Sequence, residues 1–149
     1  MTARGYDNVL LPTDGSEATL AAVEEAGHIA ALSGATVHVL SIADTRNRFE
    51  SPTAGLAVDA WEQAEHERAE AAIDRAVEAL PDDVPTERVV RAGIPKTEVL
   101  DYVDETDVDL VVMGTHGRTG LDHYLIGSVT EKVVRLADVP VLTVPLASA

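Results

Sequence analysis

The amino-acid sequence predicts an α/β fold, a single domain with an open five-stranded parallel sheet and helices on both faces. The chain has 149 residues, about the length of one ordinary domain. Short apolar runs alternate with longer segments of helical periodicity, which is the arrangement of βαβ units. The apolar runs contain few polar residues, as expected for strands covered on both faces. We therefore expect residues 1–149 to form one domain.

Strand and helix alternate twice in the first half of the chain. Apolar and β-branched residues predict strands over 8–13 and 35–42. Apolar residues at helical spacing predict helices over about 16–33 and 56–80. Residues 43–55 combine proline, glycine and mixed charge, so we expect a loop there.

The second half repeats this alternation and ends on a strand. The segments 86–91, 109–113 and 140–144 have the composition of buried strands. A helix is expected over 95–105, where a proline suits the first turn, and another over 128–136. The expected order of elements is thus βαβαβαβαβ.

The composition excludes several classes of function. The chain has 26 acidic and 11 basic residues and a formal net charge of −15. We therefore expect no binding to nucleic acids or anionic membranes, which attract basic proteins. Cysteine is absent, which rules out disulfides, iron–sulfur clusters and thiolate metal sites. No apolar run approaches the roughly 20 residues of a membrane helix, and we expect a cytoplasmic protein.

The distribution of charge is uneven. Lysine occurs only at Lys96 and Lys132, and so much acid with so little lysine resembles proteins of halophiles that accumulate salt; an ordinary acidic protein is the alternative. Residues 113–135 contain three basic and two acidic residues, a net charge of +1. A segment without net negative charge is what an anion-binding site in so acidic a chain requires.

The most informative segment joins the fourth expected strand to the last helix. It has the pattern Gly114-x2-Gly117-x9-Gly127-Ser128. Ligands of open α/β sheets bind at the carboxyl ends of strands, and a helix N-terminus binds phosphate through its free N–H groups. Ser128 and Glu131 also have the spacing of a capping box. The same glycines are compatible with simple turns.

Five motifs in this order resemble those of the universal stress protein family. They are residues 9–16 (VLLPTDGS), 93–95 (GIP), 111–117 (VVMGTHG), the glycine pattern of 114–128 and residues 140–144 (PVLTV). The resemblance covers essentially the whole chain, and the glycine pattern is similar to that of the ATP-binding branch. It implies the strand order 3-2-1-4-5, with the switch point between the first and fourth strands.

The resemblance implies an adenine-nucleotide site that holds ATP with Mg²⁺. Asp14 would bond the ribose or lie near the metal, Ile42 would offer its backbone to adenine, and Arg118 would touch the phosphates. The positions that match the family's binding residues are Pro12, Thr13, Asp14, Ile42, Met113, Gly114, Gly117, Arg118, Gly127, Ser128, Val129 and Thr130.

Simpler interpretations stand beside these. Asp14 is also suited to stabilising its turn and the following helix, Ser128 to capping, and Arg118 to a solvated loop. His116 and His123 have no third ligand at suitable spacing for a metal.

Two functional classes fit the expected site. The first is an ATP-binding regulatory module that signals through its occupancy. The second is a slow ATPase, or a nucleotidyl- or phosphotransferase, although the chain lacks the lysine of a GxxxxGK[ST] motif. A flavodoxin-like scaffold with an empty site is a third alternative.

The last strand is also a candidate interface. It is apolar, and in the implied strand order it lies at an edge of the sheet, where pairing with another chain is favoured. The resemblance likewise implies dimers through this strand. We expect a homodimer through the residues Val139, Val141, Leu142 and Val144.

Overall fold

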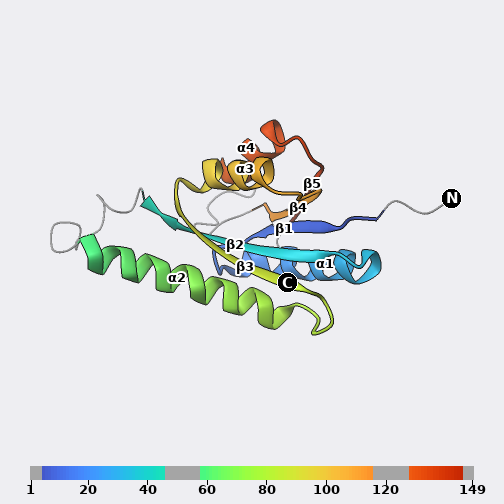
Figure 1. The fold of residues 1–149 in the computed structure, drawn as a ribbon, viewed down its shortest axis with the longest axis horizontal. Coiled ribbons are helices and arrows are strands. Elements are labelled where there is room, and N and C mark those ends of the chain that lie inside the picture. Colours follow the sequence, from blue (N-terminus) through green and yellow to red (C-terminus); the bar gives the residue numbers. More distant parts are fainter. Residues whose placement is uncertain (1–4, 46–57, 116–127, 146–149) are drawn as a thin grey trace.

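The computed structural model describes residues 5–45, 58–115 and 128–145. The strands are β1 (Asn8–Pro12), β2 (Thr36–Asp44), β3 (Thr86–Gly93), β4 (Leu110–Gly114) and β5 (Val141–Val144). The helices are α1 (Glu17–Ser33), α2 (Val58–Ala79), α3 (Pro95–Glu105) and α4 (Ser128–Leu136). All strand pairs are parallel, and their order is β3-β2-β1-β4-β5. This confirms the predicted sheet and its order (Figure 1).

The expected elements are all present, with boundaries that shift by at most two residues. The main correction concerns β2, which continues through Ala43 and Asp44 where a loop was expected. These two residues pair with Ala92 and Gly93 of β3, which is also longer than expected. The two extensions support each other, because each supplies the hydrogen-bonding partner that the other strand needs.

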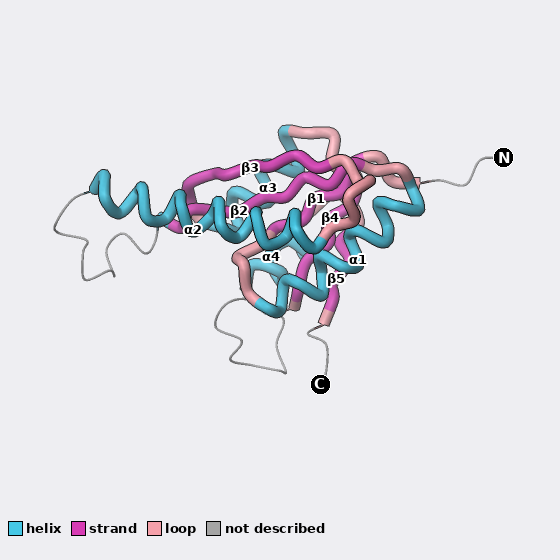
Figure 2. The backbone as a smooth tube through the Cα atoms, turned by 90° about the horizontal axis from the view of Figure 1, so that it is seen from below, coloured by secondary structure: helices cyan, strands magenta, loops and turns pink. Residues whose placement is uncertain are grey.

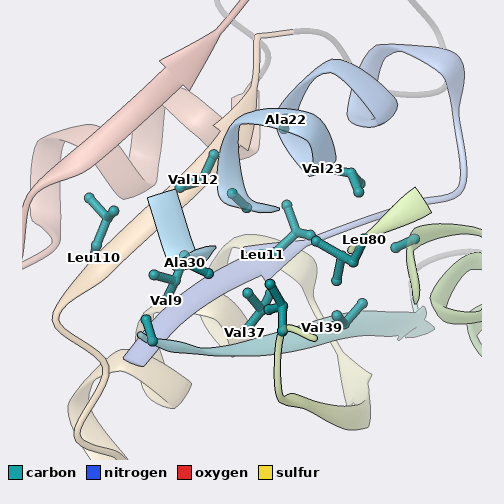
Figure 3. Packing of buried hydrophobic residues seen from close by; sticks show 14 of the residues in the cluster. Val9, Leu11, Ala22, Val23, Ala30, Val37, Val39, Leu80, Leu110 and Val112 are labelled. Carbon is teal, nitrogen blue, oxygen red and sulfur yellow. The ribbon is translucent and has the colours of Figure 1, made fainter. Parts of the chain in front are cut away.

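Alternate residues of the central strands face opposite layers of helices, as the two-residue period of a strand requires. Val9 and Leu11 of β1 belong to a cluster that includes Val37 and Val39 of β2 and buried residues of α1 and α2 (Figure 3). Leu10 belongs instead to a second cluster, packed against α3 and α4. The helices α1 and α2 therefore cover one face of the sheet, and α3 and α4 cover the other. Figure 2 shows the same elements from below.

The helices α1 and α2 meet closely at Gly27. A Cβ atom built on this glycine would lie 2.8 Å from Cδ of Pro81, just beyond the end of α2. Since real Cβ atoms essentially never come so near another heavy atom, the helix α1 needs glycine at this point.

The second core contains a polar cluster between β2 and α3. His38 Nδ1 lies 2.7 Å from the Tyr102 hydroxyl and 3.2 Å from a Glu87 carboxylate oxygen, and His38 Nε2 lies 3.0 Å from Asn8 Oδ1. Burial raises the pKa of Tyr102, the charge of Glu87 raises it further, and Arg91 partly offsets both. His38 is thus a buried histidine whose polar atoms all have partners.

No helix in the described part of the chain combines the length and apolarity needed to cross a membrane.

Candidate functional site

The strands β1 and β4 are neighbours in the sheet but pair over only a short distance. Their register joins Val9 to Leu110 and Leu10 to Val111, whereas β1 continues to Pro12 and β4 to Gly114. The chain leaves β1 toward β2 on one side and leaves β4 toward β5 on the other. This is the topological switch point, where ligands of open α/β sheets bind.

The turn that follows β1 is held by side-chain hydroxyls. Thr13, which is only 7% exposed, accepts a hydrogen bond from the Gly15 amide at 3.2 Å, and its hydroxyl lies 3.1 Å from that of Thr19. The Thr19 hydroxyl in turn donates to the Ser16 carbonyl at 2.8 Å. Gly15 has a φ of +79°, a conformation that glycine adopts without strain.

Asp14 is positioned by the same turn. Its Oδ1 accepts a hydrogen bond from the Ser16 amide at 3.0 Å, so one carboxylate oxygen has a local structural role, as the simpler interpretation expected. The other oxygen, Oδ2, makes no hydrogen bond within the described ranges. Asp14 is half-buried at the carboxyl end of β1, and this oxygen is the group it can offer to a ligand.

The end of β4 is tied to the start of α4. Thr130 is 5% exposed, and its hydroxyl donates to the Gly114 carbonyl at 2.8 Å. The next residue of β4's exit, Thr115, donates its amide to the Val144 carbonyl at 3.1 Å. The N-terminus of α4, whose free N–H groups favour anions, therefore lies beside the strand end that faces the switch point.

The expected capping box of α4 is wrong. Ser128 is the first residue of the helix rather than a residue before it, and the carboxylate of Glu131 pairs with Arg135 at 2.9 Å, one turn further along. An i, i+4 pair with arginine competes with the cap for this side chain. Ser128 is exposed and Val129 is half-buried against the second core.

Three other predicted residues lie along the ends of the strands. Pro12 is half-buried and is the last residue of β1. Met113 is 4% exposed with its side chain in the second core, so only its backbone is suited to a ligand. Ile42 was expected to end the second strand. This expectation is wrong, because β2 runs on to Asp44.

The remaining predicted site residues are Gly117, Arg118 and Gly127, and they lie outside the described residues, as do His116 and His123. Within the described ranges, no group of three or more histidine, aspartate or glutamate side chains forms a metal site.

Two residues at the site were not predicted. Thr19 completes the hydroxyl pair with Thr13, and its place in the Asp14 turn is visible in sequence only as a threonine early in a helix. Arg75 of α2 donates to the Gly15 carbonyl, across 60 residues of sequence. No local pattern indicates such a contact.

The fold defines a class of protein: a doubly wound α/β domain whose topological switch point lies between β1 and β4. Comparison with known proteins narrows the class. The sequence model of the universal stress protein family matches residues 5–145, so the chain belongs to that family. Universal stress protein MJ0531 of Methanocaldococcus jannaschii is 34% identical over 146 residues, which cover 93% of this chain and 82% of that protein.

Two solved structures that are similar to this chain have the same fold. The structure of hypothetical protein MJ0577, from the same organism, superimposes with a TM-score of 0.82 at 28% identity and covers 98% of this chain and all of its own. A universal stress protein in complex with cAMP has a TM-score of 0.66 at 30% identity, and the match covers 97% of this chain and 100% of that one.

Proposed function

We propose that this protein binds an adenine nucleotide, ATP with Mg²⁺, at the switch point and acts as a nucleotide-dependent regulatory module. The observation that carries the proposal is the separation of β1 and β4 after two paired positions. It leaves the Asp14 turn on one side and the Gly114–α4 junction on the other. A polar ligand at this point would meet a carboxylate oxygen from the first and helical N–H groups from the second.

Two further considerations support a nucleotide. A relative of the same fold, 30% identical to this chain, was solved in complex with cAMP. The sequence also retains the three glycines and the serine of the pattern that resembles the ATP-binding branch, at Gly114, Gly117, Gly127 and Ser128. Glycines at such positions allow phosphate to approach the backbone closely.

The residues present also fit Mg²⁺ bound together with phosphate. Mg²⁺ in nucleotide sites takes one or two protein carboxylates and completes its shell with phosphate oxygens and water. Asp14 Oδ2 is one such carboxylate oxygen. The Mg²⁺ would thus arrive with the nucleotide rather than occupy a site made by protein groups alone.

Calorimetric titration of ATP·Mg²⁺ in molar KCl tests the proposal, after nucleotide that co-purifies has been removed. Wild type is compared with Gly127→Val, which places a branched side chain where phosphate should approach, and with Asp14→Asn, which keeps an acceptor for the Ser16 amide. We expect binding to wild type and its loss in Gly127→Val with an unchanged circular dichroism spectrum. Absence of binding by the wild type to ATP, ADP, AMP and cAMP would leave the scaffold interpretation.

The same protein samples separate a binding module from an enzyme. Release of inorganic phosphate is measured over hours with ATP·Mg²⁺ in excess, and transfer to a second nucleotide by chromatography of the products. A regulatory module predicts no turnover above the buffer rate. Turnover that Asp14→Asn abolishes while binding is retained would favour the slow ATPase or transferase.

We also propose that the chain forms a homodimer through β5. This strand is an edge of the sheet, Leu142 on it is 36% exposed, and the nearby helix α4 exposes Val134 and Leu136. Leu142→Lys should therefore give a monomer in light scattering. The matched control is Ile94→Lys, which charges an exposed apolar residue beside the opposite edge strand β3. A Leu142→Lys protein with the mass of the wild type would contradict the proposal.

A further inference from the structure

The helix α2 touches the Asp14 turn through two residues on one of its faces. Arg75 Nη1 donates a hydrogen bond to the Gly15 carbonyl. Three residues earlier, Ala72 lies directly against Gly15, since a Cβ built on that glycine would be 3.2 Å from the Ala72 Cβ. Residues three apart lie on the same side of a helix, so α2 holds the turn by one steric and one polar contact.

The partner of Arg75 is unusual for this chain. Four other arginines in the described ranges, Arg68, Arg88, Arg91 and Arg135, pair with carboxylates. Arg75 pairs with none there, although the chain has 26 acidic residues. Its guanidinium is directed instead to the backbone carbonyl of Gly15, the residue that follows Asp14.

Three other polar groups of the turn are bonded within the turn itself. The Gly15 amide bonds Thr13, the Ser16 amide bonds Asp14, and the Ser16 carbonyl accepts from Thr19. The Gly15 carbonyl instead accepts its hydrogen bond from outside the turn, from Arg75 of α2. Rotation of the peptide that follows Gly15 would carry the Ser16 amide away from Asp14, so Arg75 bears on the direction of the Asp14 carboxylate.

We propose that Arg75 is a positioning residue for the nucleotide site: by fixing the Gly15 carbonyl, it fixes the Asp14 carboxylate in the direction that meets the ligand. This inference rests on the proposed function. It differs from a direct role, in which the guanidinium would itself touch phosphate. In the positioning role that we propose, the Asp14 carboxylate acts on the ribose. Adenosine and ATP·Mg²⁺ share this ribose, so the nucleoside alone suffices to detect Arg75.

The test compares Arg75→Gln with wild type in two titrations, one with adenosine and one with ATP·Mg²⁺. Arg75 is exposed, so the variant should fold. Arg88→Gln is the matched control: it removes the same charge and an exposed contact with α2, the bridge to Asp74, but leaves Gly15 untouched. Exchange of the Ser16 amide with solvent, followed by NMR without ligand, reports on the turn itself.

We expect Arg75→Gln to lower the affinities for adenosine and for ATP·Mg²⁺ by the same factor, about 3- to 10-fold. This is the effect of losing one exposed charge-assisted hydrogen bond. Ser16 exchange should accelerate in parallel, while Arg88→Gln changes neither quantity. Arg75→Lys, which keeps a charged donor, should recover part of the affinity for both ligands.

Other outcomes separate the two proposals. A loss confined to ATP·Mg²⁺, with adenosine affinity and Ser16 exchange unchanged, would overturn the positioning role in favour of direct phosphate contact. Unchanged affinity for both ligands in Arg75→Gln would overturn it as well, while leaving the nucleotide site intact. If wild type binds neither ligand, the proposed function fails, and the positioning role fails with it.

Discussion

The bond between Thr130 and Gly114 offers the sharpest test of how the site is built. We predict that Thr130→Val lowers both the stability of the protein and its affinity for nucleotide. The substitution keeps the shape of a 5% exposed side chain but removes the donor to the Gly114 carbonyl, 2.8 Å away. The tie between the end of β4 and the first turn of α4 is then lost.

The expected magnitude follows from the burial of this bond. Loss of a buried hydrogen bond that leaves its acceptor unsatisfied costs about 1–3 kcal/mol, and the methyl group that replaces the hydroxyl returns part of this, on the order of 0.8 kcal/mol. We therefore expect a loss of about 0.2–2 kcal/mol in the free energy of unfolding. For a domain of this size that corresponds to a fall in Tm of up to roughly 8 °C.

Affinity for the nucleotide should fall as well, because the N-terminus of α4 would no longer be fixed against β4 before the ligand binds. Binding would then include the free-energy cost of ordering it. If this cost is about 0.7–1.4 kcal/mol, affinity falls about 3- to 10-fold. Urea denaturation gives the first quantity, and calorimetric titration of ATP·Mg²⁺ gives the second.

Thr106→Val is the matched control. The Thr106 hydroxyl donates to the Tyr102 carbonyl at 2.7 Å, so the same chemical change occurs at the end of α3, before β4 and away from the carboxyl ends of the strands. This variant should lose stability and keep its affinity. Equal affinities for wild type and Thr130→Val, or an equal loss in Thr106→Val, would refute the assignment of the α4 tie to the site.

Three other predictions concern the rest of the fold. The pKa of Tyr102 is raised by burial and by Glu87, so as pH rises the unfolded chain loses the Tyr102 proton before the folded protein does. The free energy of unfolding should therefore fall as pH rises above about 10. Urea titrations at alkaline pH should show a less steep fall in Tyr102→Phe. Gly27→Ala should cost about 1–3 kcal/mol by overpacking against Pro81, read from the urea midpoint. The chain has a net charge of −15, and salt screens the repulsion between its acidic residues. Tm measured by circular dichroism should therefore rise from 0.1 M to molar KCl, and a Tm that does not change with KCl concentration would contradict this.

The sheet was predictable because each central strand is an apolar run that can be recognised from neighbouring residues in the sequence. Every residue of β4 is buried, and its uninterrupted apolar run already indicated a strand covered on both faces. The end of β2 was not predictable in the same way. Asp44 is a charged residue beside a segment rich in loop-forming residues, and its place in the sheet depends on the pairing with Gly93, 49 residues later.

In the candidate site, too, contacts between residues close in sequence were predictable and contacts between distant residues were not. The Asp14 turn was predictable from the run Asp-Gly-Ser after a strand, because its bonds join residues that are close in sequence. The bond from Arg75 to Gly15 joins residues 60 apart, and that between His38 and Tyr102 joins residues 64 apart. Glu131 failed as a capping residue for a local reason, since Arg135 is an equally near partner. Sequence patterns thus indicate which groups are present at a site, and packing decides which of them meet.

The uneven pairing within the sheet bears on how occupancy of the site could act as a signal. β2 and β3 are joined over eight register positions and β4 and β5 over four, whereas β1 and β4 share two. The least extensive seam therefore lies between a block of β3, β2 and β1 and a block of β4 and β5. The nucleotide that we propose at the carboxyl ends of β1 and β4 would contact both blocks, and it would favour the arrangement in which both sets of contacts are made. The second block carries β5, the edge through which we propose that the chain dimerises. Binding at the seam and association at the edge then act on the same two-stranded block, which is the physical basis on which a binding module with this fold can report its occupancy to a partner.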